Sequence, residues 1–227
     1  MKLADAVRFH RRPGSRRSPD TVAAGSGSGS GSGAGSARAS TDRPRVSVRP
    51  PAAADRAEFL ASMRASQRLH RPWLASVTTD EGFDALLERV GNDRYEPLLV
   101  CREPDAAIVG FFSISEIVRG GFQSAYLGYG VVAAHAGRGY MGAGLELVLA
   151  HAFDALGLHR LEANIQPGNQ PSIALVRRAG FQREGFSERY LLIDGQWRDH
   201  ERWAIRVEQW RGADGARQVT GTPAVAD

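Results

Sequence analysis

The stretch from Ala136 to Leu145, AGRGYMGAGL, holds four glycines in ten residues and leads from a strand-like segment into an apolar helical one. Glycine weakens a helix start, so a cluster there indicates a sharp turn or the close approach of another group. Backbone N–H groups at a helix N-terminus point toward an anion, and this end carries about half a positive charge. With Arg138 as a further cation, the stretch predicts a phosphate-binding loop. The alternative is that the glycines only allow a tight turn or close packing.

Two familiar nucleotide-binding patterns fit this loop poorly. Gly137, Gly139 and Gly142 match the dinucleotide fingerprint, and Glu162 follows about 20 residues later. The fold that carries this fingerprint places it at its first strand–helix turn, inside a parallel sheet. Here three expected strands precede the strand that leads into the loop, and Glu162 falls early in its own strand, so a nucleotide-dependent oxidoreductase stays a distant alternative. A P-loop is excluded because no Gly-Lys-Ser/Thr follows.

Hydrophobic periodicity predicts the elements that position this loop. Strands are expected at 46–50, 97–103, 107–115, 125–132, 159–167, 182–193 and 196–206. Helices are expected at 53–67, from a capping box at Thr78–Glu81 to Gly91, from the glycine stretch to Gly157, and at 171–180. Asp194-Gly195 is a strong hairpin turn. The order β-α-α-β-β-β-α-β-α-β-β indicates an α+β fold with a mixed sheet.

Charge and composition divide the chain into a globular part and two polar ends. Residues 1–45 hold nine basic and three acidic residues, a net charge of +6, and the rest hold 20 and 22, a net charge of −2. A slightly acidic globular part argues against a nucleic-acid-binding domain. We expect a disordered basic leader with a Gly/Ser linker at 1–43, one domain at 44–211 and a flexible tail at 212–227.

The same composition suggests a cytoplasmic protein. Cys101 is the single cysteine, so disulfides do not hold the fold, and a reducing compartment is the default. No apolar run approaches the roughly 18 residues needed to cross a membrane. The histidines show no metal-ligand spacing, so we expect no metal.

Three motifs of the chain resemble those of the GNAT superfamily of N-acetyltransferases. The strand LGYGVV, the loop GRGYM and the helix after it are similar to the family's acetyl-CoA motif, [Gln/Arg]-x-x-Gly-x-[Gly/Ala], which reads Ala136–Met141 here. Asn169-x-x-Ser172 and the following AGF resemble the second family block. The segment Tyr190–His200, YLLIDGQWRDH, resembles the RimJ branch, bacterial enzymes that acetylate the N-terminal alanine of a ribosomal protein.

The resemblance extends over about 44–211 and implies a central, mostly antiparallel, splayed sheet of about seven strands flanked by about four helices. It implies acetyl-CoA as co-substrate and direct attack of a neutral amine on the thioester. A strand N–H near Val131–Val132 would bind the thioester carbonyl. Ala136 departs from the family's Gln or Arg, and Met141 from its small residue. The implied cofactor-binding residues are Val131, Val132, Gly137, Arg138, Gly139, Tyr140, Met141, Gly142 and Asn169.

The catalytic groups are less defined by the resemblance. The Glu and Tyr of some related enzymes fall at Asn164 and Val176 here, so the usual base and acid are absent. We expect Ser172 to protonate the leaving thiolate, with helix capping as the alternative, and Glu162 to relay a proton through water, with a solvated strand face as the alternative. Asn169 would bind the pantetheine arm or cap a helix.

An α-amine suits a site without a strong base. Its pKa is about 7.7–8.0, against about 10.4 for lysine, so about a tenth is already neutral near pH 7. We therefore expect acetylation of a protein N-terminus starting with Ala or Ser, such as that of a ribosomal protein. The alternatives are acetylation of a small amine such as an aminoglycoside or polyamine, and a non-catalytic acyl-CoA-binding protein. Membrane and specific nucleic-acid partners are not expected, and monomer and dimer both stay open.

Overall fold

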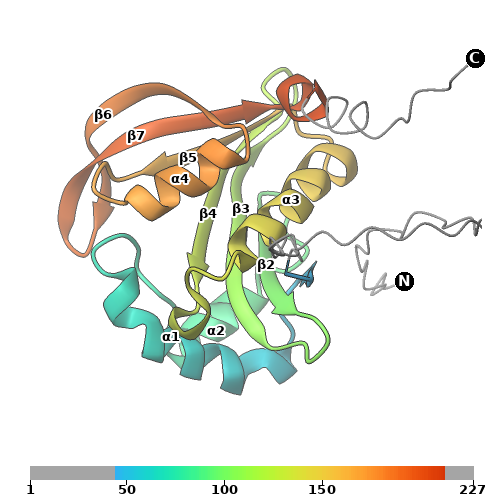
Figure 1. The fold of residues 1–227 in the computed structure, drawn as a ribbon, viewed down its shortest axis with the longest axis vertical. Helices are drawn as coiled ribbons and strands as arrows, with labels where there is room; N and C mark the ends of the chain where they lie inside the picture. Colours follow the sequence, from blue (N-terminus) through green and yellow to red (C-terminus); the bar gives the residue numbers. More distant parts are fainter. Residues whose placement is uncertain (1–43, 213–227) are drawn as a thin grey trace, which may run out of the picture.

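The computed structural model describes residues 44–212, and its centre is one seven-stranded sheet in the order β1-β2-β3-β4-β5-β7-β6 (Figure 1). The strands are β1 Val46–Arg49, β2 Tyr95–Arg102, β3 Ile108–Val118, β4 Ser124–Val131, β5 Arg160–Ile165, β6 Gln182–Ile193 and β7 Gln196–Arg206. The α-helices with assigned bounds are α1 Arg56–His70, α2 Asp80–Leu87, α3 Tyr140–Ala150 and α4 Gln170–Arg178. Residues 207–212 are also helical.

Neighbouring strands run antiparallel except for β4 and β5, which run parallel. Alternating side chains of the sheet support two cores, one on each face. On one face Val100 and Phe112 pack with α3, and on the other Leu99 and Phe111 pack with α1 and α2. The mixed sheet confirms the predicted GNAT fold and the order of its elements. It also excludes the parallel, doubly wound sheet that a dinucleotide fold requires.

Three local predictions were less accurate. The cap of α2 is Thr79, whose Oγ1 accepts a hydrogen bond from the Gly82 N–H at 3.2 Å, so the capping box predicted at Thr78 is wrong. The helix ends at Leu87, so Val90 lies beyond it and is exposed. After α3, residues His151–Ala155 form a π-helical turn that periodicity does not reveal.

The two predicted polar ends of the chain lie almost wholly outside residues 44–212. The leader predicted at 1–43 and the tail predicted at 212–227 lie outside the described residues, except for Gly212, which is helical. Between residues 44 and 212, no helix is both long and apolar enough to cross a membrane. Within that range there is also no group of three or more His, Cys, Asp or Glu side chains that could hold a metal ion.

Candidate functional site

The candidate site is the gap that opens between β4 and β5. Their pairing comprises three residue pairs and ends at Tyr126 and Glu162, after which the two parallel strands separate. At the far end of β4, the Val132 N–H donates to the Val109 carbonyl of the neighbouring chain segment at 2.9 Å. Alternation along an antiparallel strand therefore turns the N–H of Val131 away from β3 and toward the gap. Of the two predicted carbonyl-binding amides, Val131 faces the gap, whereas Val132 is used within the sheet.

The glycine loop follows β4 after a short 3-10 turn at Ala133–His135 and ends at the N-terminus of α3. Gly137 and Gly139 have φ angles of 74° and 80°, a left-handed conformation that favours glycine. Gly139 is the N-cap residue of α3, and the N–H groups of Gly142 and Ala143 donate to its carbonyl at 3.1 and 3.2 Å. The N–H groups before Gly142 are thus the ones that the first helical turn leaves for an anion.

Different glycines in this stretch have different roles. A Cβ on Gly137 or Gly142 would meet no other atom within 4 Å, which leaves the outer side of the loop open. A Cβ on Gly144 would lie 3.0 Å from Val100 and 3.3 Å from Phe112. The packing explanation is therefore correct for Gly144, because this glycine lets α3 approach the sheet closely. The Met141 side chain lies against Gly110 of β3, so it is turned toward the sheet.

Arg138 and the N-terminus of α3 make the loop electropositive. His135 lies just before it, and burial together with the charges of Arg102 and Arg138 lowers the pKa of this imidazole. Tyr140 packs edge-on against His135, with ring centroids 5.8 Å apart. A lowered pKa keeps His135 neutral at pH 7. Arg102 forms an ion pair with Asp105 at 2.5 Å, so the positive charge of the loop comes mainly from Arg138 and from the helix dipole.

Ser172 and Asn169 lie together at the start of α4. The Asn169 Oδ1 accepts the Ser172 N–H at 3.3 Å, which makes Asn169 the cap of α4, one of its two expected roles. From β4, the half-buried Tyr129 side chain reaches across to Ser172, with its hydroxyl 3.4 Å from the Ser172 carbonyl oxygen. Burial raises the pKa of Tyr129, so its hydroxyl stays protonated. The structure thus brings Ser172 next to a strand that borders the gap.

Glu162 and Asn164 lie on the opposite side of the gap, on β5. Glu162 is at the closed end, where its carboxylate pairs with Arg160 at 2.7 Å and its side chain is 13% exposed. Val131 is five residues further along β4 than Tyr126, a distance of about 16 Å along a strand. The structure therefore does not bring Glu162 to Val131. Asn164 lies two residues nearer to the open end, and its buried Oδ1 has no hydrogen-bond partner.

The loop 71–79 between α1 and α2 spans the open end of the gap. On the β5 side, Gln166 Nε2 donates to the Pro72 carbonyl at 3.0 Å. Trp73 packs against the same side, since a Cβ on Gly168 would lie 3.2 Å from its indole ring. On the β4 side, the residue before the loop, His70 at the end of α1, places its Nε2 2.8 Å from the Val131 carbonyl oxygen.

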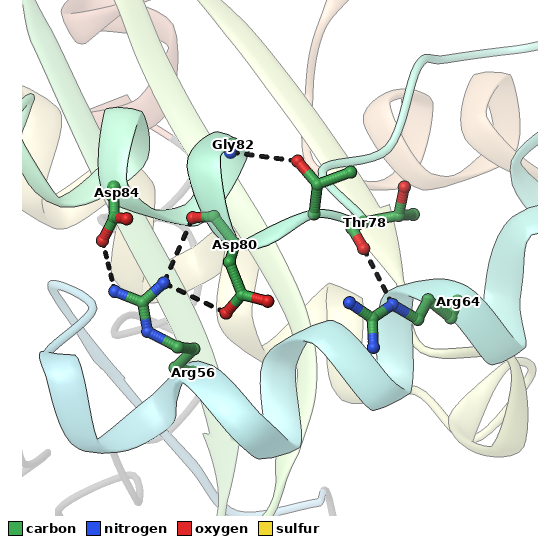
Figure 2. Close-up of polar contacts among 7 residues, drawn as sticks. Arg56, Arg64, Thr78, Asp80, Gly82 and Asp84 are labelled. Carbon is green, nitrogen blue, oxygen red and sulfur yellow. Dashed lines mark hydrogen bonds and ion pairs between the residues drawn. The ribbon is translucent and has the colours of Figure 1, made fainter.

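Ion pairs hold this loop and α2 against α1 (Figure 2). Arg56 donates to the carbonyl and carboxylate of Asp80 and to the Asp84 carboxylate, and Arg64 Nε donates to the Thr78 carbonyl at 2.8 Å. Two cavities flank the loop. One, of about 210 Å³, lies between the loop and the turn at Ile193 and Asp194. The other, of about 240 Å³, lies under α1 and α2 and reaches β4; Leu74 and Ala75 line both cavities.

Sequence reasoning did not identify His70, Gln166 or Tyr129 as site residues. Each contacts a partner more than 40 residues away in the chain, which a local pattern does not reveal. For His70 the sequence does offer one signal: it lies at the end of the apolar face of a helix. A histidine buried there needs polar partners for its ring nitrogens.

Comparisons with known proteins agree with this geometry. Residues 45–182 match the acetyltransferase (GNAT) domain family. The chain is 36% identical over 118 residues to the probable N-acetyltransferase YjcK of Bacillus subtilis, covering 52% of this chain and 65% of that protein. It is 39% identical over 109 residues to the [ribosomal protein uS5]-alanine N-acetyltransferase of Escherichia coli, covering 48% and 56%. It thus spans less than two thirds of both relatives.

Among solved structures, RimJ of Mycobacterium smegmatis in complex with CoA-disulfide has a TM-score of 0.69 and 31% identity, over 77% of this chain and 88% of that protein. The family match extends over more than half of the chain and includes β1 to α4, the glycine loop and the gap. The chain therefore belongs to the GNAT family of acetyltransferases.

Proposed function

We propose that this protein transfers the acetyl group of acetyl-CoA to the α-amino group of a protein N-terminus that starts with Ala or Ser. The observation that carries this proposal is the similarity to two proteins: the E. coli alanine N-acetyltransferase, which is named for this kind of reaction, and M. smegmatis RimJ, which was solved in complex with CoA-disulfide. The second of these extends over most of both chains. A cytoplasmic location follows from such a substrate.

The residues present fit CoA. A pyrophosphate needs backbone donors, positive charge and space, and the loop offers N–H groups between Gly137 and Met141, the cation Arg138 and open space above Gly137 and Gly142. Ala136 stands in place of the family's Gln or Arg, so one side-chain donor to the pyrophosphate is missing. The backbone N–H groups of the loop can bind the pyrophosphate without it. The extended arm of the molecule would lie in the gap between β4 and β5.

The reaction requires few groups from the protein. The amine nitrogen forms a bond to the thioester carbonyl carbon, the C–S bond breaks, the amine gives up a proton and the thiolate takes one. Val131 N–H would donate to the carbonyl oxygen as negative charge develops on it. Ser172 is the proposed proton donor to the sulfur, since it lies beside the gap on α4.

The proton that the amine gives up does not need a strong base as its acceptor. An α-amine is partly neutral at pH 7, so water held at the polar edge of β5 suffices. Asn164, with its unpartnered buried Oδ1, lies nearer to the open end than Glu162 and is the group placed to hold such a water. Of the two catalytic residues proposed from the sequence, the geometry favours Ser172 over Glu162.

The cavities favour a peptide over a polyamine. A polycation needs several carboxylates around it, but in the cavity beside loop 71–79 the acidic residue is Asp194, which lies 3.9 Å from Arg71. The residues that line the second cavity include no acidic side chain. Neutral or apolar side chains of an N-terminal segment suit both cavities better.

The test uses the full 227-residue chain, acetyl-CoA and a set of peptides that differ only in residue one. Mass spectrometry of fragments then shows whether an acetyl group is added and whether it is on the α-amine or on a lysine. We expect acetylation of the α-amine of peptides that start with Ala or Ser.

Two other results would redirect the proposal. Acetylation of polyamines or aminoglycosides without acetylation of peptides would make the chain a small-amine acetyltransferase. A rise in melting temperature with acetyl-CoA, without acetylation of any amine, would make it an acyl-CoA-binding protein.

A further inference from the structure

His70 is a buried histidine at the centre of the candidate site. It is the last residue of α1, its side chain is buried with 3% of the residue exposed, and both ring nitrogens have partners. Nε2 lies 2.8 Å from the Val131 carbonyl oxygen, and Nδ1 lies 2.5 Å from the Ser76 Oγ. The ring therefore links three segments that are distant in sequence: α1, loop 71–79 and the end of β4.

The contact with Val131 fixes one particular peptide group. The peptide between Val131 and Val132 donates its N–H to the Val109 carbonyl on one side, and its carbonyl accepts from His70 on the other. A peptide held at both ends has one orientation. The N–H of Val131 itself is on the same side of the strand as this carbonyl, so its direction is set as well.

The chemistry of one partner defines which ring nitrogen carries a hydrogen. A carbonyl oxygen only accepts, so Nε2 must carry a hydrogen. In the neutral imidazole Nδ1 is then the acceptor, and the Ser76 hydroxyl donates to it. The Ser76 hydroxyl, the His70 ring and the Val131 carbonyl thus form one hydrogen-bonded chain from loop 71–79 to β4.

We propose that His70 is a positioning residue that orients the Val131 amide for the thioester carbonyl and, through Ser76, ties this amide to the loop over the acceptor side. This inference rests on the proposed function, because it assumes that an acyl-CoA thioester occupies the gap. It adds a residue and a role that the glycine loop and α4 do not supply. Loop 71–79 would then affect catalysis even where it does not touch the amine.

A neighbouring serine provides a matched control. Ser66, one turn earlier on α1, is also buried, and its Oγ accepts the Ala133 N–H at 2.9 Å. Ser66 therefore joins α1 to the same stretch of chain without contacting Val131. A variant at Ser66 reports the cost of loosening α1, whereas a variant at His70 also reports the orientation of the amide.

The experiment compares two ligands that differ only at the carbonyl: acetyl-CoA and its S-ethyl thioether, in which CH2 replaces C=O. Titration calorimetry on the full chain gives the affinity ratio for the wild type, His70→Asn, His70→Gln and Ser66→Ala. The Gln amide can still reach Val131, whereas the Asn side chain is too short. Steady-state rates with an accepted peptide give kcat and KM for the same variants.

A single neutral hydrogen bond predicts that the wild type prefers acetyl-CoA about 2- to 10-fold. We expect this preference to vanish in His70→Asn and to persist in His70→Gln and Ser66→Ala. The affinity for free CoA should change less than about twofold in all variants. In His70→Asn, KM for acetyl-CoA should rise by no more than the same 2- to 10-fold, whereas kcat should also fall at least about tenfold, because the hydrogen bond to the carbonyl oxygen strengthens as negative charge develops in the transition state.

Several results would overturn the inference. A preference in His70→Asn equal to that of the wild type would show that the ring does not orient the amide. No preference in the wild type would show that Val131 does not bind the carbonyl. If His70→Asn does not fold, Ser76→Ala frees the ring without removing it, and an unchanged preference there would equally refute the role. Failure of every peptide to be acetylated, with the preference behaving as expected, would instead refute the proposed acceptor.

Discussion

Replacement of Gly139 tests whether backbone conformation is the reason for glycine at the start of α3. Gly139 has a φ of 80°, and an added Cβ would lie 3.4 Å from the ring of Pro44, an ordinary contact. Strain and not collision should therefore decide the effect. A non-glycine residue in the left-handed region costs about 1–2 kcal/mol, and Asn tolerates this region better than Ala.

We expect Gly139→Ala to lower the free energy of unfolding by about 1–2 kcal/mol, a fall of roughly 2–8 °C in melting temperature for a domain of this size. Gly139→Asn should lower it less, although Asn is the larger residue. If the loop relieves the strain by rearranging, its N–H groups turn away and the affinity for CoA falls by up to about 5- to 30-fold.

The assays are thermal unfolding with and without CoA, and titration calorimetry with CoA. Gly142→Ala is the control, because Gly142 has no positive φ and its Cβ would meet no other atom. Its unfolding free energy should stay within about 0.5 kcal/mol of the wild type or rise slightly. If Gly139→Asn proves less stable than Gly139→Ala, side-chain size and not backbone strain requires the glycine, and the reasoning is refuted.

The remaining predictions concern other residues of the site and core. Ser172→Ala should lower kcat by about 100-fold or more, as expected for loss of a general acid. The fold should keep its stability, because Asn169 caps α4 through the backbone N–H of Ser172. An unchanged kcat in steady-state assays would remove Ser172 from the mechanism. Glu162→Gln should change kcat less than about threefold, well short of the 100-fold effect of a general base, because Glu162 lies at the closed end of the gap and Arg160 keeps Glu184 as a partner. Gly144→Ala should destabilise the fold by about 1–3 kcal/mol in urea unfolding, since its Cβ would crowd the packed contact between α3 and the sheet. Burial lowers the pKa of His200 in the folded protein, so the unfolded chain, where the pKa is about 6.5, binds the proton more readily. The free energy of unfolding therefore falls as the pH drops below about 6.5. His200→Gln should make the melting temperature fall less between pH 7 and pH 5.

Much of this fold was predictable because its signals are local. Asp194-Gly195 predicts the β6–β7 hairpin, and both residues have the positive φ angles that such a turn needs. The four glycines similarly mark the transition from β4 to α3. Thr78 and Thr79 show the limit of such patterns, since two adjacent threonines offer the same cap and only packing against α1 selects one of them.

The arrangement across the sheet was not predictable in the same way. Nothing local to β7 shows that it pairs with β5 and places β6 at the edge. The same is true of the separation of β4 and β5, which decides that Asn164 and not Glu162 lies near the open end. His70 illustrates the point for side chains: its role depends on Val131, 61 residues away, and on the orientation of one peptide group.

The short pairing of β4 with β5 also has a consequence for cooperativity. It divides the sheet into a block of four strands and a block of three, joined by three residue pairs. Few backbone hydrogen bonds then couple the stability of one block to that of the other, so each can open with its own free energy. A molecule that fills the gap would act as a missing strand between them. Hydrogen exchange should therefore show both blocks becoming protected together when CoA is added, including amides far from the ligand.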